Sequence, residues 1–284
     1  LIARHFSTAL AQTELGVGDD AALFTPRPGM QLAVSSDMLV AGTHFFADAE
    51  PFLLGWKTAA VNISDIAAMA GEPRWITLAL SLPAVDEAWV AALAAGFHAC
   101  CKAFRVDWVG GDTTRGPLNL CATVFGEVPS GKAVRRDGAQ PGDEIWVSGE
   151  PGLAALGLAQ LNGRLDLSEA WQETCVMRLH KPMPRVELGL ALRGIANAMI
   201  DVSDGLLGDL AHILQRSGVG AVIDDACLGG FAPQDTTRIT ALAEDTGVAV
   251  HYIGRIVAET GLSLAKGAGE TERPLTPKGY DHFA

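Results

Sequence analysis

Positive charge is scarce in this sequence of 284 residues. Its 21 Lys and Arg residues stand against 33 Asp and Glu residues, which gives a formal net charge of −12. An acidic surface argues against nucleic acid or an anionic membrane as a partner, because both attract basic proteins. Nucleotides remain compatible with it, because bound Mg²⁺ reverses the local field around carboxylates.

Long apolar runs are also absent. No stretch of about 18 apolar residues is free of charges and helix breakers, so we predict no transmembrane helix. The first ten residues, "LIARHFSTAL", show no signal-peptide pattern. With 49% hydrophobic and 19% charged residues, the chain is expected to bury a sizeable core.

Cysteine is infrequent, and no CxxC pair or Cys/His spacing typical of a zinc site occurs. The number of cysteines is odd, which argues against a complete disulfide framework. We therefore expect reduced, mostly buried thiols in a cytoplasmic protein. The cysteines are Cys100, Cys101, Cys121, Cys175 and Cys227.

Several catalytic motifs are missing as well. The sequence has no GxxxxGK[ST] P-loop and none of the protein-kinase signatures. It also has no GxSxG and no HExxH motif. Any phosphoryl-transfer chemistry would therefore use a less common scaffold.

The order of the predicted elements indicates a mixed α/β or α+β fold in two domains. Strand-like runs, such as "QLAVSSDMLV" and "LCATVFGEV", alternate with helical patterns, such as "PFLLGWKTAAVNISDIAAMAG", through about residue 138. The segment "RRDGAQPGDEIWVSGEPG" is rich in Gly, Pro and charge, and is the best candidate boundary. We predict one domain at residues 1–138 and an α+β domain at residues 139–284.

Two aspartates lie where a folded chain disfavours them. Asp37 is inside an apolar run, and strands disfavour aspartate in their interior. Asp65 is in the middle of a predicted helix, in one stripe with apolar residues four positions away on either side. Neither has a turn or a helix cap to explain it. Such an aspartate is costly unless it is paired, protonated or bound to a metal.

Further aspartates lie in stretches rich in Gly, Ser or Thr. "LGVGDDAALF" contains Asp19 and Asp20, "VGGDTTRG" contains Asp112 after a predicted strand, and "IDVSDG" contains Asp201 and Asp204 at a helix start. Each has an ordinary explanation, because aspartate favours turns and the first turn of a helix. Asp20 is the better candidate ligand of its pair, whereas Asp19 is expected to shape the turn or to bind through water.

Taken together, these five aspartate sites fit one hard-metal site better than five separate accidents. Carboxylates, hydroxyls and carbonyls are oxygen ligands of the kind that Mg²⁺ takes, usually together with substrate phosphates. The glycines would let backbone N–H groups approach those phosphates, and Arg115, Arg135 and Arg136 are candidate phosphate clamps. The sequence therefore predicts Mg²⁺-dependent phosphoryl transfer, which needs positioning and charge neutralisation more than a covalent nucleophile.

Six stretches together resemble the bacterial thiamine-monophosphate kinases: "GVGDDAAL", "SSDMLVAGTHF", "WKTAAVNISDIAAMAGEP", "GGDTTRGP", "IDVSDGL" and "KGYDHF". These enzymes belong to the PurM-like superfamily of ATP-using proteins, and the resemblance covers nearly the whole chain in order. It implies a two-domain fold and direct transfer of the ATP γ-phosphate to thiamine monophosphate, assisted by several Mg²⁺ ions. It also implies a homodimer built by the N-terminal domains, with ATP between the domains.

The resemblance also implies roles for individual residues, carried over motif by motif. The implied metal ligands are Asp20, Ser35, Ser36, Asp37, Asp65, Asp112, Asp201 and Asp204. The implied ATP contacts are Gly111, Asp112, Arg136 and Ser203. The implied thiamine monophosphate contacts are His44 and Tyr280. No side chain stands out as a general base.

One stretch departs from the family pattern. The family normally carries an acidic "GGEDYEL"-like stretch in the C-terminal domain, whose glutamate contacts the substrate. Here "IDDACLGG" runs directly into "FAPQDTTRIT" at Gly230–Phe231. We favour residues missing from the sequence at this join. The alternative is a deletion, in which case substrate binding is in doubt.

Two other functions remain as alternatives. A selenophosphate synthetase or purine-pathway synthetase would share the superfamily fold, but the selenophosphate enzyme needs a reactive Cys or selenocysteine in an N-terminal glycine loop. The first cysteine here is Cys100, in a predicted helix. A non-catalytic ATP/Mg²⁺ sensor is the other alternative, supported by the absent acidic stretch.

Overall fold

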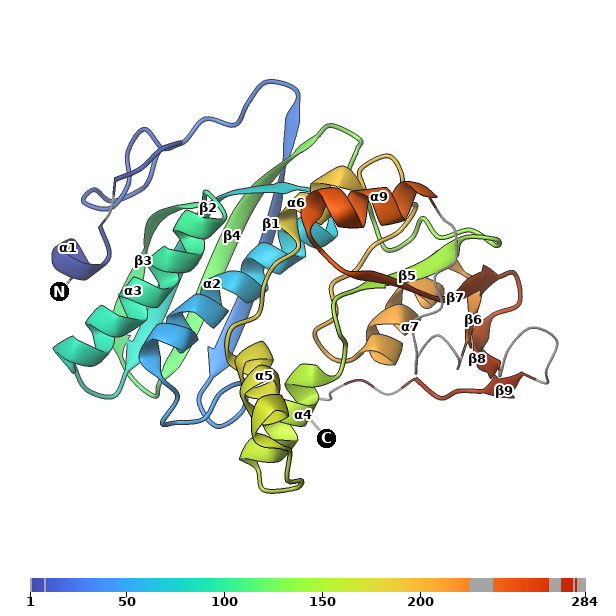
Figure 1. Cartoon of the computed structure of the whole chain (residues 1–284). Helices are drawn as coiled ribbons and strands as arrows, with labels where there is room; N and C mark the ends of the chain where they lie inside the picture. Colours follow the sequence, from blue (N-terminus) through green and yellow to red (C-terminus); the bar gives the residue numbers. More distant parts are fainter. Residues whose placement is uncertain (1, 8, 225–236, 266–271, 278, 280–284) are drawn as a thin grey trace. The chain divides into compact units, whose positions relative to one another are not determined.

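The chain folds into two compact units, each with its own sheet (Figure 1). The computed structural model describes residues 2–7, 9–224, 237–265, 272–277 and 279. Unit 1 comprises residues 1–133 and 154–186, and unit 2 comprises residues 134–153 and 187–284. The predicted mixed α/β, two-domain fold is confirmed.

Unit 1 contains a four-stranded sheet in the order β1-β4-β2-β3. Strand β4 pairs antiparallel with both β1 and β2, whereas β2 and β3 run parallel. Strands β1 and β3 are therefore the two edges of the sheet. The strands are β1 (Met30–Val40), β2 (Glu72–Leu82), β3 (Asp107–Arg115) and β4 (Asn119–Pro129).

Helices α2 (Pro51–Ala68) and α3 (Glu87–Ala103) lie side by side on one face of this sheet (Figure 1). Each begins at an acidic cap, whose carboxylate accepts hydrogen bonds from backbone N–H groups of the first turn. Glu50 accepts from Phe52 and Leu53, and Asp86 accepts from Ala88 and Trp89.

The two helices approach closely at a pair of glycines. A Cβ atom on Gly55 would lie 2.0 Å from the carbonyl oxygen of Leu93, and one on Gly96 would lie 1.8 Å from that of Phe52. No larger residue fits at either position without moving a helix. The sequence therefore fixes how closely α2 and α3 pack.

The two faces of the sheet differ in burial. Along β1, Ala33 and Leu39 face the helices and are buried, while Leu32, Val34 and Met38 are 45–57% exposed. This alternation is the period-two pattern of a strand with one covered face. The uncovered side of the sheet, called the open face below, is apolar over much of β1.

Residues from the second half of the sequence complete unit 1. Helices α4 (Leu153–Leu161) and α5 (Glu169–His180) follow β5 in the chain, yet residues 154–186 pack with unit 1. Trp56 of α2 donates its Nε1–H to the carbonyl oxygen of Pro182 at 2.9 Å. Residues after the predicted boundary at 138/139 thus also contribute to unit 1, and the predicted domain limits stay a prediction.

Unit 2 contains a five-stranded sheet in the order β5-β7-β6-β8-β9. Helix α7 packs on it through Leu210 and Leu214, which share a core with Ile223, Ile253 and Ile256. The strands are β5 (Glu144–Ser148), β6 (Gly220–Asp224), β7 (Val250–Val257), β8 (Gly261–Ala265) and β9 (Arg273–Pro274). The remaining helices of the described residues are α1 (Ile2–His5), α6 (Val186–Ala191), α7 (Leu206–Ser217) and α9 (Thr237–Thr246).

The structure also bears on membrane-spanning helices and on the cysteines. Among the described residues, no helix combines the length and apolar character needed to cross a membrane. The cysteines in the described ranges are free thiols, of which Cys100, Cys101 and Cys175 are buried and Cys121 is partly exposed. Cys227 lies outside the described residues.

Candidate active site

The structure brings together the two aspartates that the sequence marked as costly. Asp37 and Ser35 are two positions apart on the helix-facing side of β1, and Asp65 lies on α2. The Ser35 hydroxyl donates to Asp65 Oδ2 at 2.5 Å. Burial, and then the negative charge of Asp65, raise the pKa of Asp37 to about 6. Two half-buried carboxylates therefore repel each other across the β1–α2 contact.

Asn62 of α2 fixes the position of Asp37 next to the helix, although it was not among the predicted site residues. Its side chain is fully buried. Oδ1 accepts from the backbone N–H of Asp37 at 3.1 Å, while Nδ2 donates to the carbonyl oxygen of Thr58 at 3.0 Å. A signal was available, because Asn62 is a polar residue one helical turn before Asp65 on an apolar helix.

The Gly-Asp-Asp stretch forms a turn between two short paired segments. Leu15 and Leu23 pair through backbone hydrogen bonds of 2.8 and 3.1 Å. Asp19 Oδ1 accepts from the backbone N–H of Asp20 at 2.8 Å, so Asp19 shapes the turn as predicted. The side chain of Asp20 is exposed at this turn. It stays a predicted metal ligand.

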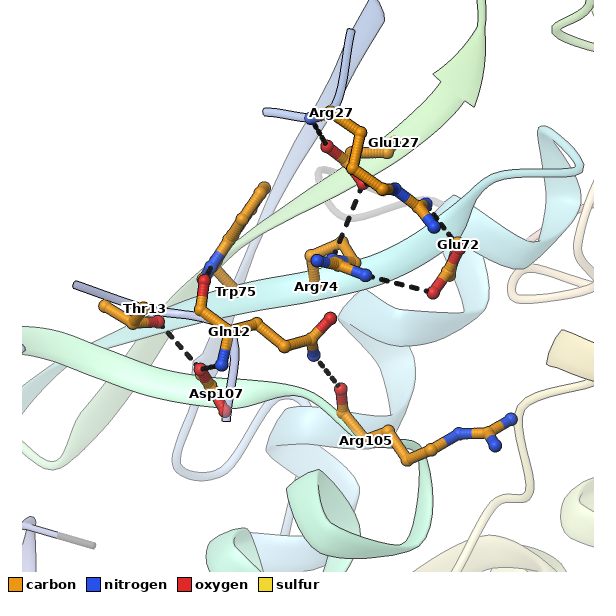
Figure 2. Close-up of polar contacts among 9 residues, drawn as sticks. All are labelled: Gln12, Thr13, Arg27, Glu72, Arg74, Trp75, Arg105, Asp107 and Glu127. Atoms are coloured by element: carbon orange, nitrogen blue, oxygen red, sulfur yellow. Dashed lines mark hydrogen bonds and ion pairs between the residues drawn. The ribbon is translucent and has the colours of Figure 1, made fainter. Parts of the chain in front are cut away.

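Two carboxylates fasten the segment that carries this turn (Figure 2). Near its start, buried Asp107 of β3 accepts from the backbone N–H of Gln12 at 2.7 Å and from the Thr13 hydroxyl at 2.8 Å. Gln12 also donates to the carbonyl oxygen of Arg105 at 2.6 Å. The start of the segment is therefore fixed to the edge strand β3.

At the other end of the segment, Glu127 of β4 receives Arg27 (Figure 2). The Glu127 side chain has no exposed surface, and it accepts from both the backbone N–H and the Nε–H of Arg27 at 2.6 Å. Arg74 Nε lies 3.5 Å from Glu127, and both arginines also pair with Glu72. Four charged groups thus compensate one another around a buried carboxylate.

Gly111 lies in the same lateral row of the sheet as Asp37. Asp37 pairs with Ala122, Ala122 with Leu78, and Leu78 with Gly111. Three strand spacings separate the row's ends by roughly 14 Å. At Gly111, φ is +149° and a Cβ would lie 1.8 Å from the Leu78 carbonyl oxygen, so only glycine fits.

Asp112 is exposed and belongs to the next row, since its partner on β2 is Ala79. The strand was expected to end in the Gly-Gly-Asp of this stretch, but β3 continues to Arg115, because the parallel pairing with β2 extends to Leu82. Ser36 does not lie with the Asp37–Asp65 pair. Its hydroxyl donates to the Ala122 carbonyl oxygen at 3.1 Å, and its side chain is on the open face, away from Asp65.

His44 lies in the turn that follows β1. The backbone N–H of Val40 donates to His44 Nδ1 at 3.0 Å, which places the proton of the neutral ring on Nε2. Lys57 of α2 donates to the His44 carbonyl oxygen at 3.2 Å. The turn is therefore held from both the strand and the helix.

In unit 2, the "VSDG" loop is organised by a residue that the sequence analysis did not single out. Buried Asp209, in the first turn of α7, accepts at Oδ2 from the backbone N–H groups of Ser203, Asp204 and Gly205 at 2.9–3.1 Å. Burial raises the pKa of Asp209, while these hydrogen bonds oppose the rise. Ser203 and Asp204 are consequently exposed on a fixed loop.

The remaining predicted residues of unit 2 lie at other positions of the unit or outside the described part. Arg136 is exposed, and its carbonyl oxygen accepts from the Ser217 hydroxyl at 2.9 Å. Gly279 lies beside Asp204, since a Cβ there would be 3.5 Å from the Asp204 Cβ. Asp201, just before the loop, is half-buried. Tyr280 lies outside the described residues.

The described residues contain no group of three or more His, Cys, Asp or Glu side chains placed to hold a metal ion. The structure thus pairs Asp37 with Asp65 and leaves Asp20 and Asp112 apart from them within unit 1. Asp201 and Asp204 belong to unit 2. A shared metal site for the whole set stays a prediction.

Comparison with known families defines the class of this chain. Residues 18–128 match the family model described as AIR synthase related protein, N-terminal domain. Residues 140–237 match the one described as AIR synthase related protein, C-terminal domain. The two domains in this order are those of the PurM-like class, and the predicted boundary at 138/139 falls between them.

Similar individual proteins and solved structures narrow the family further. Thiamine-monophosphate kinase of Escherichia coli O157:H7 is 47% identical, over 100% of this chain and 97% of that protein. The crystal structure of thiamine-monophosphate kinase from Stenotrophomonas maltophilia K279a is 42% identical, covers 91% of this chain and 92% of its own, and has a TM-score of 0.82. AaThiL complexed with AMPPCP and TMP is 26% identical, covers 91% and 89%, and has a TM-score of 0.77. The chain belongs to the thiamine-monophosphate kinase family.

Proposed function

We propose that this protein transfers the γ-phosphoryl group of ATP to thiamine monophosphate, giving thiamine diphosphate and ADP. An oxygen of the substrate phosphate forms a bond to the γ-phosphorus as the bond to the β–γ bridging oxygen breaks. The single observation that carries the proposal is the end-to-end match to thiamine-monophosphate kinases. The paired carboxylates Asp37 and Asp65, in stretches that carried the family resemblance, agree with it.

Mg²⁺ fits the chemistry of these carboxylates. The pKa of Asp37 is raised by burial and then by the negative charge of Asp65, and a bound divalent cation would offset both effects. Bound Mg²⁺ neutralises charge on phosphate oxygens. We propose that Asp20, Ser35, Ser36, Asp37, Asp65, Asp112, Asp201 and Asp204 supply the ligands for several ions.

The substrate contacts are proposed from the family motifs and the geometry of this chain. Gly111, Asp112, Arg136 and Ser203 would contact ATP, and His44 and Tyr280 would contact thiamine monophosphate. The Asp209-bound loop at Ser203 presents backbone N–H groups on an exposed turn, as phosphate binding needs. No general base is assigned, since the substrate phosphate is itself the nucleophile.

We further propose a homodimer formed through unit 1. The open face of its sheet exposes Leu32, Val34 and Met38, and apolar surface of this kind marks an interaction site. A sheet with one face on its helices and one apolar face outward gains stability when a second copy covers that face. The free cysteines are consistent with a cytoplasmic enzyme, which we also propose.

A product assay tests the proposal. The purified protein is mixed with ATP, Mg²⁺ and thiamine monophosphate, and thiamine phosphates and nucleotides are separated by chromatography. We expect thiamine diphosphate and ADP in equal amounts. Formation of neither from an intact, ATP-binding protein would contradict the kinase and favour the ATP sensor.

The sensor has one observation in its favour. The alignment with the Escherichia coli kinase spans 320 positions, whereas this chain has 284 residues, so it contains positions at which this chain has none. The acidic glycine stretch expected near Gly230–Phe231 is not in the sequence, and these positions lie outside the described residues. Turnover in the product assay would favour residues missing from the sequence at this join over a deletion that abolishes substrate binding.

A further inference from the structure

Lys57 is a half-buried cation on the α2 row that also carries Asp65. The two positions are separated by two i, i+4 steps, or about 12 Å along the helix axis. Its Nζ donates to the carbonyl oxygen of His44 at 3.2 Å. The lysine therefore points from α2 to the turn that follows β1.

Among the described residues, no acidic side chain compensates the charge of Lys57. Burial lowers the pKa of Lys57. No carboxylate in the described part of the chain lies within ion-pair distance of its Nζ. A hydrogen bond to one neutral carbonyl only partly offsets the free-energy cost of desolvating an ammonium group. Buried charges normally pair with an opposite charge.

The neighbouring titratable groups are themselves basic. Burial, followed by the positive charge of Lys57, lowers the pKa of His180 at the end of α5. Lys181 Nζ lies 4.5 Å from the ring centroid of Trp56, the residue before Lys57. In a chain with a net charge of −12, basic groups thus gather where α2, α5 and the His44 turn meet. Such a place suits an anion.

We propose that Lys57 is a positioning residue for the phosphate-monoester substrate. It fixes the His44 turn through the carbonyl and keeps a positive charge beside it. Because Nδ1 of His44 is occupied by the Val40 N–H, the turn can present the ring in one orientation only while both contacts hold. This inference rests on the proposed function, in which His44 contacts thiamine monophosphate.

The test uses three variants of the full chain. Lys57→Met keeps the apolar stem and removes the ammonium group, and Lys57→Arg keeps a cationic donor. Lys102→Met is the matched control, since Lys102 is an exposed lysine near the end of α3. The Michaelis constant and kcat are measured for both substrates, and the unfolding temperature is measured for each variant.

We expect Lys57→Met to raise the Michaelis constant for thiamine monophosphate roughly ten- to a hundredfold, the loss typical of a hydrogen bond from a charged group. The constant for ATP should not change, and Lys57→Arg should recover part of the loss. The unfolding temperature of Lys57→Met should equal or exceed that of the wild type, because an uncompensated buried charge is removed. A purely structural lysine would give the opposite result.

Two results would overturn this inference while leaving the proposed function intact. One is an active Lys57→Met enzyme with an unchanged Michaelis constant for thiamine monophosphate. The other is a lower unfolding temperature with equal losses for both substrates. If neither the wild type nor Lys102→Met forms thiamine diphosphate, the proposed function fails first and this inference with it.

Discussion

Asp37 and Asp65 place two negative charges across one strand–helix contact. Nothing in the fold of unit 1 requires this, because like charges in partial burial oppose each other. Ser35 and Asn62 nevertheless hold both in place through hydrogen bonds of 2.5 and 3.1 Å. That the pair is maintained against its own repulsion supports the proposal that both carboxylates bind a cation.

Asp65→Asn should keep the fold and remove most of the activity. The amide still offers an oxygen to the Ser35 hydroxyl, but it lacks the charge that would bind Mg²⁺. We expect kcat to fall by about a hundredfold or more, as for other groups that stabilise developing charge. Product chromatography measures it. The exposed Asp166→Asn serves as control, and near-normal turnover of Asp65→Asn would remove Asp65 from the site.

Cys100 should resist alkylation over the ordinary pH range. Burial raises the pKa of its thiol to about 12, so almost no thiolate is present at pH 8. Since the folded state keeps a proton that the unfolded chain releases near pH 9, stability should also fall as the pH rises from about 9 toward 12. Mass spectrometry after iodoacetamide treatment tests this. Labelling of Cys100 in the native protein, before the partly exposed Cys121, would contradict it.

Sequence reasoning found residues whose chemistry conflicts with their surroundings. Asp37 and Asp65 stood out because an apolar strand or helix does not tolerate a lone carboxylate. Asn62, Lys57 and Asp209 did not stand out, because each resembles an ordinary polar residue of a helix until its partner is known. Their partners are backbone atoms of other segments, which no local pattern specifies.

At the scale of elements, the segment from Ala11 to Arg27 has little regular structure of its own. It is held instead by Asp107 at one end and by Glu127 at the other (Figure 2). Between these points Phe24 stacks on Trp75 with ring centroids 4.2 Å apart. The position of the Asp20 turn therefore depends on the edge strand β3 and on the inner strand β4, which hold the two ends of the segment.

Glu127→Gln should destabilise unit 1 by about 3–5 kcal/mol, because it leaves Arg27 and Arg74 beside a neutral buried group. Arg27→Met should act on the same contact, so the double variant should lose less than the sum of the two. Urea unfolding measures both. The exposed pair Arg4–Glu87 is the control, and Arg4→Met should change little. Additive losses would mean that Arg27 and Glu127 are not coupled.

The elements themselves were predicted to different extents. β4 was clear from its alternation, and β1 was predicted from its apolar, strand-like run. α5 was missed because Cys175 is its one buried residue, so it has almost no apolar stripe. Its place in unit 1 follows from Trp56 and Pro182, which are 126 residues apart in sequence.

At the scale of the whole molecule, the proposed homodimer depends on the open face of the unit 1 sheet. Val34→Asp places a charge on the open face among the exposed apolar residues of β1, where Val34 is 57% exposed in the single chain. We expect this variant to sediment as a monomer, because a buried unpaired charge opposes association. Val85→Asp is the control, since Val85 is 70% exposed in the loop before α3. A dimeric Val34→Asp would move the interface elsewhere.

Asp107 and Glu127 hold a segment that lies far earlier in the sequence, and this has a consequence for the order of synthesis and folding. Asp107 receives Ala11 from 96 residues further along the chain, and Glu127 receives Arg27 from 100 residues further along. The ribosome therefore releases the segment that carries Asp20 well before either receiver exists. That segment can dock only after β4 has been synthesised, so closing so long a loop comes late in folding. The Asp20 motif is therefore synthesised before the strands that hold it and takes its final place after them.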